Sequence, residues 1–296
     1  METSRKMRVI THSGPFHTDD VFAVASLDLL LQGDYELVRT RDPEVIKTGD
    51  FVLDVGGVYD PEKNLFDHHQ EGGAGERDGI PYSSLGLVWK KYGAEICRSP
   101  EVAREIEDKL VLATDATDCG VDIIPKNDLG VHVPHMYDVI KSFRPSWKEE
   151  KSFDEGFQEA LAFAKGYLTR SIFLAHTLLE SKEKVLRAYE QASDKRIVVF
   201  EKFYPSLDAL ENFPEVLYVV YPYSGNQHWV ARAFRSERDS FRNRKDFPKA
   251  WAGKTNEELA KISGVSDAMF CHNGVWICSA RSKEGAIALA TLAADA

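Results

Sequence analysis

The stretch DFVLDVGGVYDPEKNLFDHHQ, residues 50–70, decides the fold. It begins with an apolar run, DFVLDVGG, that predicts a buried strand, and Asp54 lies near the carboxyl end of that run. It ends with DHHQ, in which one aspartate precedes two adjacent histidines. Carboxylates and imidazoles grouped at strand ends indicate a ligand site. The residues of DHHQ that matter are Asp67, His68 and His69.

Strand and helix patterns alternate on both sides of this stretch. MRVITH (7–12) and YELVRTR (35–41) predict strands, and VFAVASLDLLLQG (21–33) between them predicts a helix. Further helices are expected over 84–97 and 100–114. Alternating strands and helices imply a parallel sheet within an α/β fold, and ligands bind such sheets at the carboxyl ends of the strands.

The second half of the chain changes character. Residues 148–192 are charged, follow a helical pattern and contain no proline, whereas strand patterns dominate from residue 196 onward. We therefore expect a metal-binding catalytic domain over 1–147 and a helical connector over 148–195. A smaller α/β domain that binds substrate is expected over 196–296.

Six side chains form a candidate ligand set. Mixed imidazole and carboxylate ligands suit Mn²⁺, Zn²⁺ or Fe²⁺. Six groups exceed what one ion needs, so two ions about 3.5–4 Å apart, bridged by a carboxylate, fit the count and the reaction class of phosphoester hydrolysis. Asp54, on a rigid strand, is the expected bridge. The set is His12, His17, Asp19, Asp54, His68 and Asp115.

Single members of this set have simpler explanations. Asp19 and its neighbour Asp20 lie at a helix start, where acidic residues cap the backbone. Asp115 could satisfy a nearby turn. In an extended segment His68 and His69 point to opposite sides, so one of them at most faces the metal. Taken together, the placement of every group at the end of an element favours a metal site.

Composition limits the classes of partner. The net charge of −10 argues against a broad basic surface for long nucleic acids. No apolar run reaches the length of about 18 residues that a membrane helix needs, so no membrane partner is expected. The four cysteines form no CxxC pair and are expected to be reduced thiols of a cytoplasmic protein.

DHHQ, preceded by a strand with an aspartate and by a His…Asp loop, resembles the DHH phosphoesterase superfamily. More narrowly, THSGPFHTDDVFAVASL (11–27) and DVGGVYDPEKNLFDHHQ (54–70) are similar to the melanocyte-proliferating-gene (MYG) family. A distal block over 240–290, which includes AMFCHNGVWICSA, extends the likeness. The resemblance implies a DHH-phosphoesterase-like catalytic domain and 3′–5′ exonuclease activity on RNA. Two divalent ions are expected, Mn²⁺ first, with Mg²⁺ or another transition metal as alternatives.

The resemblance also implies roles for the early residues. In FHTD, His17 takes the place of the first aspartate of the superfamily's first motif, and Asp19 takes the place of the second. His12 precedes both and joins the metal ligands. Asp54 matches the bridging aspartate of the second motif.

The third and fourth motifs supply the remaining roles. His68 matches a metal ligand, His69 a residue that faces the substrate phosphate, and Asp67 a group that orients a histidine. Asp115 in TDATDCG matches the aspartate of the fourth motif, with Asp118 as its competitor. His69, Asp54 and Asp67 are thus the expected catalytic residues.

The second domain is expected to contact phosphate through Arg244 and Lys245. Residues 235–254 around them carry seven Lys and Arg against three Asp and Glu, and guanidinium forks match phosphate oxygens. The alternative is a solvated charged loop. His272 and Gly274 in CHNG resemble a glycine-containing turn that meets substrate, with an ordinary β-turn as the alternative.

The residues predict a metal-dependent phosphohydrolase, and the resemblance implies a 3′–5′ exonuclease on single-stranded RNA or short oligonucleotides. One alternative keeps the metal site but takes a smaller substrate, such as pyrophosphate, a cyclic dinucleotide or a very short RNA. Another alternative is a non-catalytic module that senses a metal or nucleotide. A homodimer is compatible with each of these.

Overall fold

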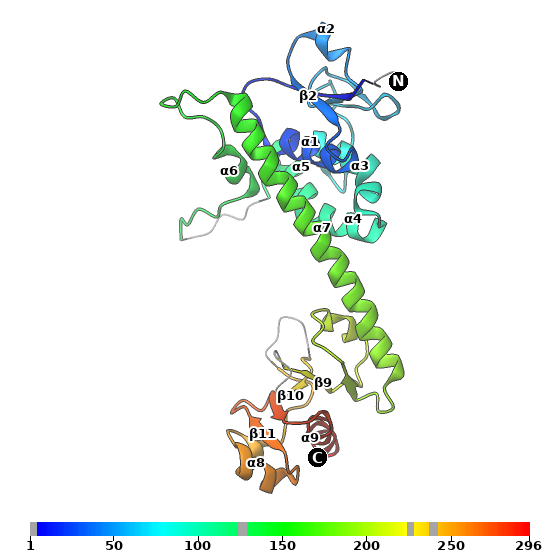
Figure 1. Cartoon of the computed structure of the whole chain (residues 1–296), viewed down its shortest axis with the longest axis vertical. Coiled ribbons are helices and arrows are strands. Elements are labelled where there is room, and N and C mark those ends of the chain that lie inside the picture. The colour runs from blue at the N-terminus through cyan, green and yellow to red at the C-terminus, as the bar shows by residue number, and fades with distance from the viewer. Residues whose placement is uncertain (1–4, 124–128, 224–227, 237–241) are drawn as a thin grey trace. The chain divides into compact units, whose positions relative to one another are not determined.

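The computed structural model divides the chain into two compact units, Met1–His176 and Thr177–Ala296. The point of division lies within one long helix, α7 (Phe153–Gln191), shown in green in Figure 1. Among the described residues, no helix is both long and apolar enough to cross a membrane. The described residues are 5–123, 129–223, 228–236 and 242–296.

A five-stranded sheet forms the centre of the first unit. Its order is β2-β1-β3-β5-β4, and the first four strands run parallel, as expected for alternating strands and helices. The last strand, β4, runs antiparallel to β5 at the edge. The strands are β1 (Met7–Thr11), β2 (Tyr35–Arg39), β3 (Phe51–Leu53), β4 (Tyr59–Asp60) and β5 (Leu65–Phe66).

The first helix, α1 (Thr18–Leu30), begins three residues before the expected position. Its start is held by Asp20, whose Oδ1 accepts a hydrogen bond from the His17 N–H at 2.8 Å. Residues Thr18 to Leu27 are all buried, because α3 (Ser84–Cys97) packs along the helix. This places the start of α1 in the protein interior.

Residues 100–118 form three consecutive helical segments where one helix over 100–114 was expected. α4 (Pro100–Ile106) is followed by the π-helical segment η2 (Glu107–Val111) and by α5 (Leu112–Asp118). π-Helical segments are rare and occur frequently at functional sites. Because the helical run extends four residues beyond the expected end, Asp118 is its last residue.

The first half of α7 packs on the first unit through aromatic side chains. Phe157 meets Phe16 edge to face with ring centroids 5.5 Å apart, and Tyr167 meets Phe22 at 6.0 Å. Elements that the sequence analysis did not anticipate complete this unit. They are α2 (Pro43–Ile46), η1 (Pro61–Lys63), α6 (Met136–Lys141) and the two-stranded pair β6 (Glu76–Arg77) and β7 (Ile80–Pro81).

The second unit has its own sheet, in the order β11-β12-β10-β9-β8. Only β8 and β9 pair in parallel among the described strands of this sheet, and buried apolar clusters pack against it together with α9 (Lys283–Asp295). The remaining elements are β8 (Ile197–Val199), η3 (Leu207–Leu210), β9 (Tyr218–Pro222), β10 (Trp229–Ala233), η4 (Lys249–Trp251), α8 (Asn256–Ser263), β11 (Ala268–Cys271) and β12 (Ile277–Ala280).

Candidate metal centre

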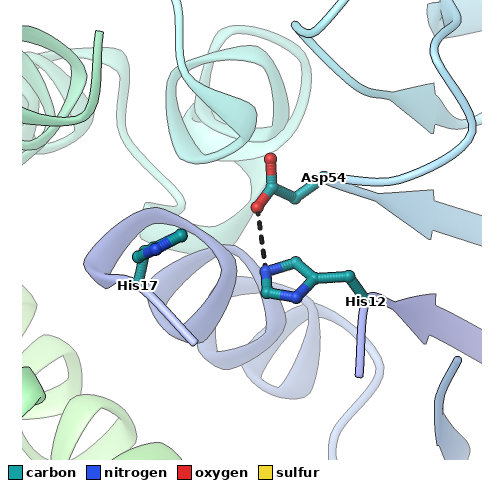
Figure 2. A group of neighbouring side chains, drawn as sticks. All are labelled: His12, His17 and Asp54. Carbon is teal, nitrogen blue, oxygen red and sulfur yellow. Dashed lines mark ion pairs between the residues drawn. The ribbon is translucent and has the colours of Figure 1, made fainter. Parts of the chain in front are cut away.

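The carboxyl ends of the parallel strands carry the central candidate ligands. His12 directly follows β1, Asp54 directly follows β3, and His68 follows β5 after one residue. Because β1, β3 and β5 are neighbours in the sheet, the three side chains meet at one edge. Figure 2 shows His12 and Asp54 pointing toward each other, with His17 at the start of α1 beside them.

Asp54 lies among three imidazoles. Its Oδ2 is 3.3 Å from His12 Nε2, and its Oδ1 is 3.2 Å from His68 Nε2 and 3.4 Å from His69 Nδ1. The side chain is only 2% exposed, and a φ of +53° turns the backbone out of the strand, a conformation uncommon outside glycine. The two carboxylate oxygens of Asp54 therefore face different imidazoles.

Further carboxylates surround the imidazoles. Asp20 Oδ2 is 3.2 Å from His12 Nε2, and Asp118 Oδ2 is 3.3 Å from His68 Nε2. Among the residues that the structure describes, four overlapping groups have ligand atoms within 4.8 Å of one another: His12–His17–Asp54, Asp54–His68–His69, His17–Asp19–Asp118 and His68–Asp118–Cys119. Shared members join these groups into one cluster.

Burial and opposite charge compete at the centre of the cluster. Burial raises the pKa of Asp54, but contacts with His12 and His68 outweigh it and lower that pKa to about 2. Burial lowers the pKa of His12, but contacts with Asp20 and Asp54 outweigh it and raise that pKa to about 10. Burial also lowers the pKa of His68, but contacts that include Asp54 outweigh it and raise that pKa to about 10. Imidazole protons thus neutralise the carboxylates here, and bound cations would replace those protons.

Asp19 lacks this compensation, and at Asp118 burial outweighs the charge of His68, so that the pKa of Asp118 stays raised. Burial raises the pKa of Asp19 well above its usual value, and the nearby charges of Asp54 and Asp118 raise it further. Within the described part of the chain, neither carboxylate oxygen of Asp19 has a hydrogen-bond partner, and neither do Asp54 Oδ1 and His68 Nε2. Buried polar atoms without partners are costly and rare. Because all are potential ligand atoms, the cluster fits divalent metal ions.

The structure brings Asp118 to the cluster and leaves Asp115 outside it. Asp115 Oδ1 accepts from Ser83 Oγ at 2.6 Å and from Ser83 N at 3.2 Å, and its Oδ2 accepts from Arg77 Nη2 at 3.0 Å. Ser83 is the N-cap residue of α3, so this carboxylate anchors a helix start. A Cβ on Gly86 would lie 2.3 Å from Asp115 Oδ2, so glycine leaves room for it. Asp118, and not Asp115, therefore lies beside the other candidate ligands.

Asparagine substitutions should distinguish the roles of Asp118 and Asp115. We expect Asp118→Asn to lower metal-dependent hydrolysis about a hundredfold, because a ligand charge is lost, with little loss of stability. We expect Asp115→Asn to lower the free energy of unfolding by about 1–3 kcal/mol through its bonds to Ser83 and Arg77, and to change kcat by a few-fold at most. Urea unfolding measures the free energy of unfolding of each variant, and a Mn²⁺ titration of activity measures its metal-dependent hydrolysis. The reverse pattern would return Asp115 to the ligand set.

Asp67 organises the DHHQ turn. Its Oδ1 accepts from the main-chain N–H of His68 at 2.7 Å and of His69 at 3.1 Å, and it lies 2.8 Å from His69 Nδ1. Its Oδ2 accepts from Gly57 N at 2.5 Å. The His68 side chain is 11% exposed, whereas that of His69 is 63% exposed. His68 thus lies inside the cluster and His69 lies at its rim.

Arg244 and Lys245 are engaged in structural contacts of the second unit. Arg244 donates to the main-chain carbonyls of Val216 at 3.1 Å and Glu211 at 2.8 Å, and its guanidinium lies over the Phe234 ring. Lys245 Nζ donates to a carbonyl in the last turn of α9 at 2.8 Å. These contacts use part of the donor capacity of both side chains, and their expected role as phosphate ligands stays a prediction. Residues 237–241 of the basic segment lie outside the described residues.

His272 and Gly274 form the turn between β11 and β12. The Gly274 N–H donates to His272 Nδ1 at 2.9 Å, and the imidazole lies 5.1 Å from the Trp276 ring. These contacts describe a local β-turn, which was the alternative interpretation of CHNG. A substrate role for these two residues stays a prediction.

Sequence reasoning missed two members of the cluster. Cys119 Sγ lies 3.8 Å from His68 Nδ1, although the cysteine was expected only to be a reduced thiol. Asp20 was expected to cap α1, but its second oxygen also contacts His12. The available signal was adjacency, because Cys119 follows Asp118 and Asp20 follows Asp19 in the sequence.

Similarity to known proteins extends over almost the whole chain. A family model described as "Uncharacterised protein family (UPF0160)", with the short name MYG1_exonuc, matches residues 8–294. The chain is 30% identical to a MYG1 protein of Caenorhabditis elegans, over 96% of this chain and 94% of the relative. It is 29% identical to one of Schizosaccharomyces pombe, over 98% of both chains. It is 28% identical to a Homo sapiens protein named MYG1 exonuclease, over 96% of this chain and 84% of that protein.

Proposed function

Because the chain belongs to the MYG1 family, we propose that it is a metal-dependent, DHH-like phosphodiesterase, and specifically a 3′–5′ exonuclease on single-stranded RNA or short oligonucleotides. The human, rat and mouse relatives are named exonucleases, which supports the nuclease part of this proposal. The observation that carries it is the position of Asp54, whose two oxygens face His12 and His68 on opposite sides.

Two divalent cations, Mn²⁺ by preference, would be held by the cluster of side chains around Asp54. When bound, they supply a water of lowered pKa and neutralise negative charge on the phosphate and the leaving oxygen. The buried carboxylates without hydrogen-bond partners support this assignment, since cations would satisfy them. The proposed ligands are His12, His17, Asp19, Asp54, His68 and Asp118.

The rim of the cluster supplies the groups for the substrate. Asp67 Oδ1 lies 2.8 Å from His69 Nδ1 and orients the ring, which leaves His69 Nε2 for a phosphate oxygen. A histidine in this position can donate a proton or hydrogen bond to the developing negative charge. Asp67 is therefore a positioning residue, and His69 is the proposed contact to the scissile phosphate.

A product gel tests the proposed function. Purified protein with Mn²⁺ is incubated with a 5′-labelled single-stranded RNA of about 20 nucleotides, longer than a typical single-strand binding site. We expect a ladder that shortens one nucleotide at a time, and no ladder in EDTA. Internal cuts in place of a ladder would contradict the exonuclease assignment, and an untouched RNA would contradict action on RNA of this length.

A smaller substrate is the second candidate. The contacts of Arg244 and Lys245 with main-chain carbonyls favour it, because they leave fewer N–H donors of these two side chains for a long phosphate backbone. Release of phosphate from pyrophosphate, or cleavage of dinucleotides with the 20-nucleotide RNA left intact, would support this candidate. No turnover of any of these substrates would favour a sensing module.

A further inference from the structure

Arg41 provides a positive charge at the opposite end of the metal cluster from His69. It follows β2 after one residue, and the Thr40 N–H between them donates to the Thr11 carbonyl at the end of β1, at 2.8 Å. The sheet order β2-β1-β3-β5 therefore sets the order of side chains along this edge. That order is Arg41, His12, Asp54, then His68 with His69.

Arg41 differs from the other arginine at the end of β2. Arg39 is 4% exposed, pairs with Asp154 and donates to the Gly14 carbonyl at 2.7 Å, so it fixes the loop after β1. Arg41 is exposed, and among the residues that the structure describes no carboxylate lies within ion-pair distance of it. An exposed guanidinium without a carboxylate, beside a cluster of carboxylates, is suited to an anion.

The contacts of Arg41 leave its terminal nitrogen available when the site is loaded. Its Nη2 lies 3.1 Å from His12 Nδ1, and its Nε lies 3.3 Å from the Ser13 carbonyl. If His12 binds a cation through Nε2, its Nδ1 carries a hydrogen, and the Ser13 carbonyl 3.2 Å away can accept it. Arginine is also only a donor, so its Nη2 then has no acceptor on the ring and can bind another one.

We propose that Arg41 binds a backbone phosphate of the substrate adjacent to the phosphate that reacts at the cluster. The His12 ring separates the two places, because Arg41 faces Nδ1 while Asp54 and Asp20 face Nε2 on the other side. A phosphate bound at the cluster is thus separated from the Arg41 guanidinium by the His12 ring. This inference rests on the proposed function and specifies its substrate class: a chain with at least two phosphodiesters, one at the cluster and one at Arg41.

Binding of an uncleavable RNA tests the proposal directly. The probe is a fluorescent RNA of about ten nucleotides whose 3′-terminal linkage is a methylphosphonate, which blocks shortening while the inner phosphates stay charged. With Mn²⁺-loaded protein, we expect Arg41→Ala to weaken binding roughly tenfold and to reduce the slope of log Kd against log salt by about 0.7. Arg41→Lys should regain part of the affinity and part of the salt slope, because lysine keeps the positive charge but not the paired N–H donors of the guanidinium.

Two controls separate phosphate binding from support of His12. Bis(p-nitrophenyl) phosphate has one phosphodiester, so Arg41→Ala should turn it over at the wild-type kcat/KM within about twofold. The rise in Tm on adding Mn²⁺ should also be unchanged. Lys47→Ala, which removes an exposed lysine paired with Glu44 in the same unit, should alter none of these values.

The outcomes distinguish the two proposals. An unchanged RNA affinity and salt slope in Arg41→Ala would overturn the role of Arg41, even if the wild type is an active exonuclease. A loss of Mn²⁺ stabilisation, or of turnover of the small diester, would overturn it as well, since Arg41 would then act through His12. A wild type that hydrolyses neither substrate would refute the proposed function, while the binding data would still decide whether Arg41 contacts phosphate.

Discussion

Replacing Asp54 with alanine should reduce metal-dependent hydrolysis by a factor of about a thousand or more. Asp54 is the only described side chain that contacts His12, His68 and His69 together, so its loss removes the bridge between the two halves of the site. Metal ions contribute several kcal/mol to the stabilisation of the transition state, and each 1.4 kcal/mol corresponds to a factor of ten in rate. The measurement is kcat on RNA and on bis(p-nitrophenyl) phosphate across a range of Mn²⁺ concentrations.

Asp34→Ala is the matched control for Asp54→Ala. Asp34 lies in the same unit, its side chain is 77% exposed, and it pairs only loosely with Lys6 at 3.2 Å. We expect wild-type activity from this variant, since surface ion pairs contribute little. Activity of Asp54→Ala close to that of Asp34→Ala would refute the assignment of Asp54 as the central ligand.

The second large effect is the change in stability expected from Asp19→Asn. This change has opposite signs with and without metal. In EDTA we expect the variant to be more stable than wild type by about 1–3 kcal/mol, because a buried carboxylate without hydrogen-bond partners is replaced by a neutral group of the same shape. In Mn²⁺ the order should reverse, because the variant lacks a ligand charge and gains less from the cation. Thermal unfolding in each condition, together with kcat, measures both effects.

The pH dependence of the Asp19→Asn difference follows from the raised pKa of Asp19. Burial and the charges of Asp54 and Asp118 raise this pKa above the ordinary value of 3.8. Well below pH 3.8 the carboxyl is protonated in both folded and unfolded chains, so its burial costs no ionisation energy. As the pH rises, only the unfolded chain ionises freely, and the metal-free wild type loses stability relative to the variant. A difference in Tm that shrinks with rising pH would contradict this account.

The arrangement of the strands and most of the cluster could be predicted from the sequence. Periodicity located β1, β2 and β3, and parallel strands bring their carboxyl ends to one edge, so His12 and Asp54 had to lie near each other. DHHQ placed His68 and His69 shortly after the strand that carries Asp54, but the two-residue strand Leu65–Phe66 that precedes them was not predicted. Local sequence patterns and the general topology of parallel sheets are sufficient to predict the positions of such residues.

Other assignments depend on long-range contacts that no local pattern reveals. The sequence offered both Asp115 and Asp118, and the choice depends on Ser83, 32 residues away, which takes the Asp115 carboxylate. The bonds of Arg244 to Glu211 and Val216 were not foreseen, because both residues lie about 30 positions away in the sequence. Arg41 was not considered, because its position beside His12 depends on the pairing of β2 with β1.

The π-helical segment Glu107–Val111 decides where its helix can lose one residue without a change in the orientation of Asp118. One residue corresponds to about 100° of rotation in an α-helix, and a π turn holds one residue more than an α turn. Deletion of a single codon within this segment would restore a regular helix and leave both the buried face of α4 and Asp118 in their present orientation. The same three-nucleotide deletion in the regular helix α5 would turn Asp118 by about 100° away from His68, although the aspartate is still encoded.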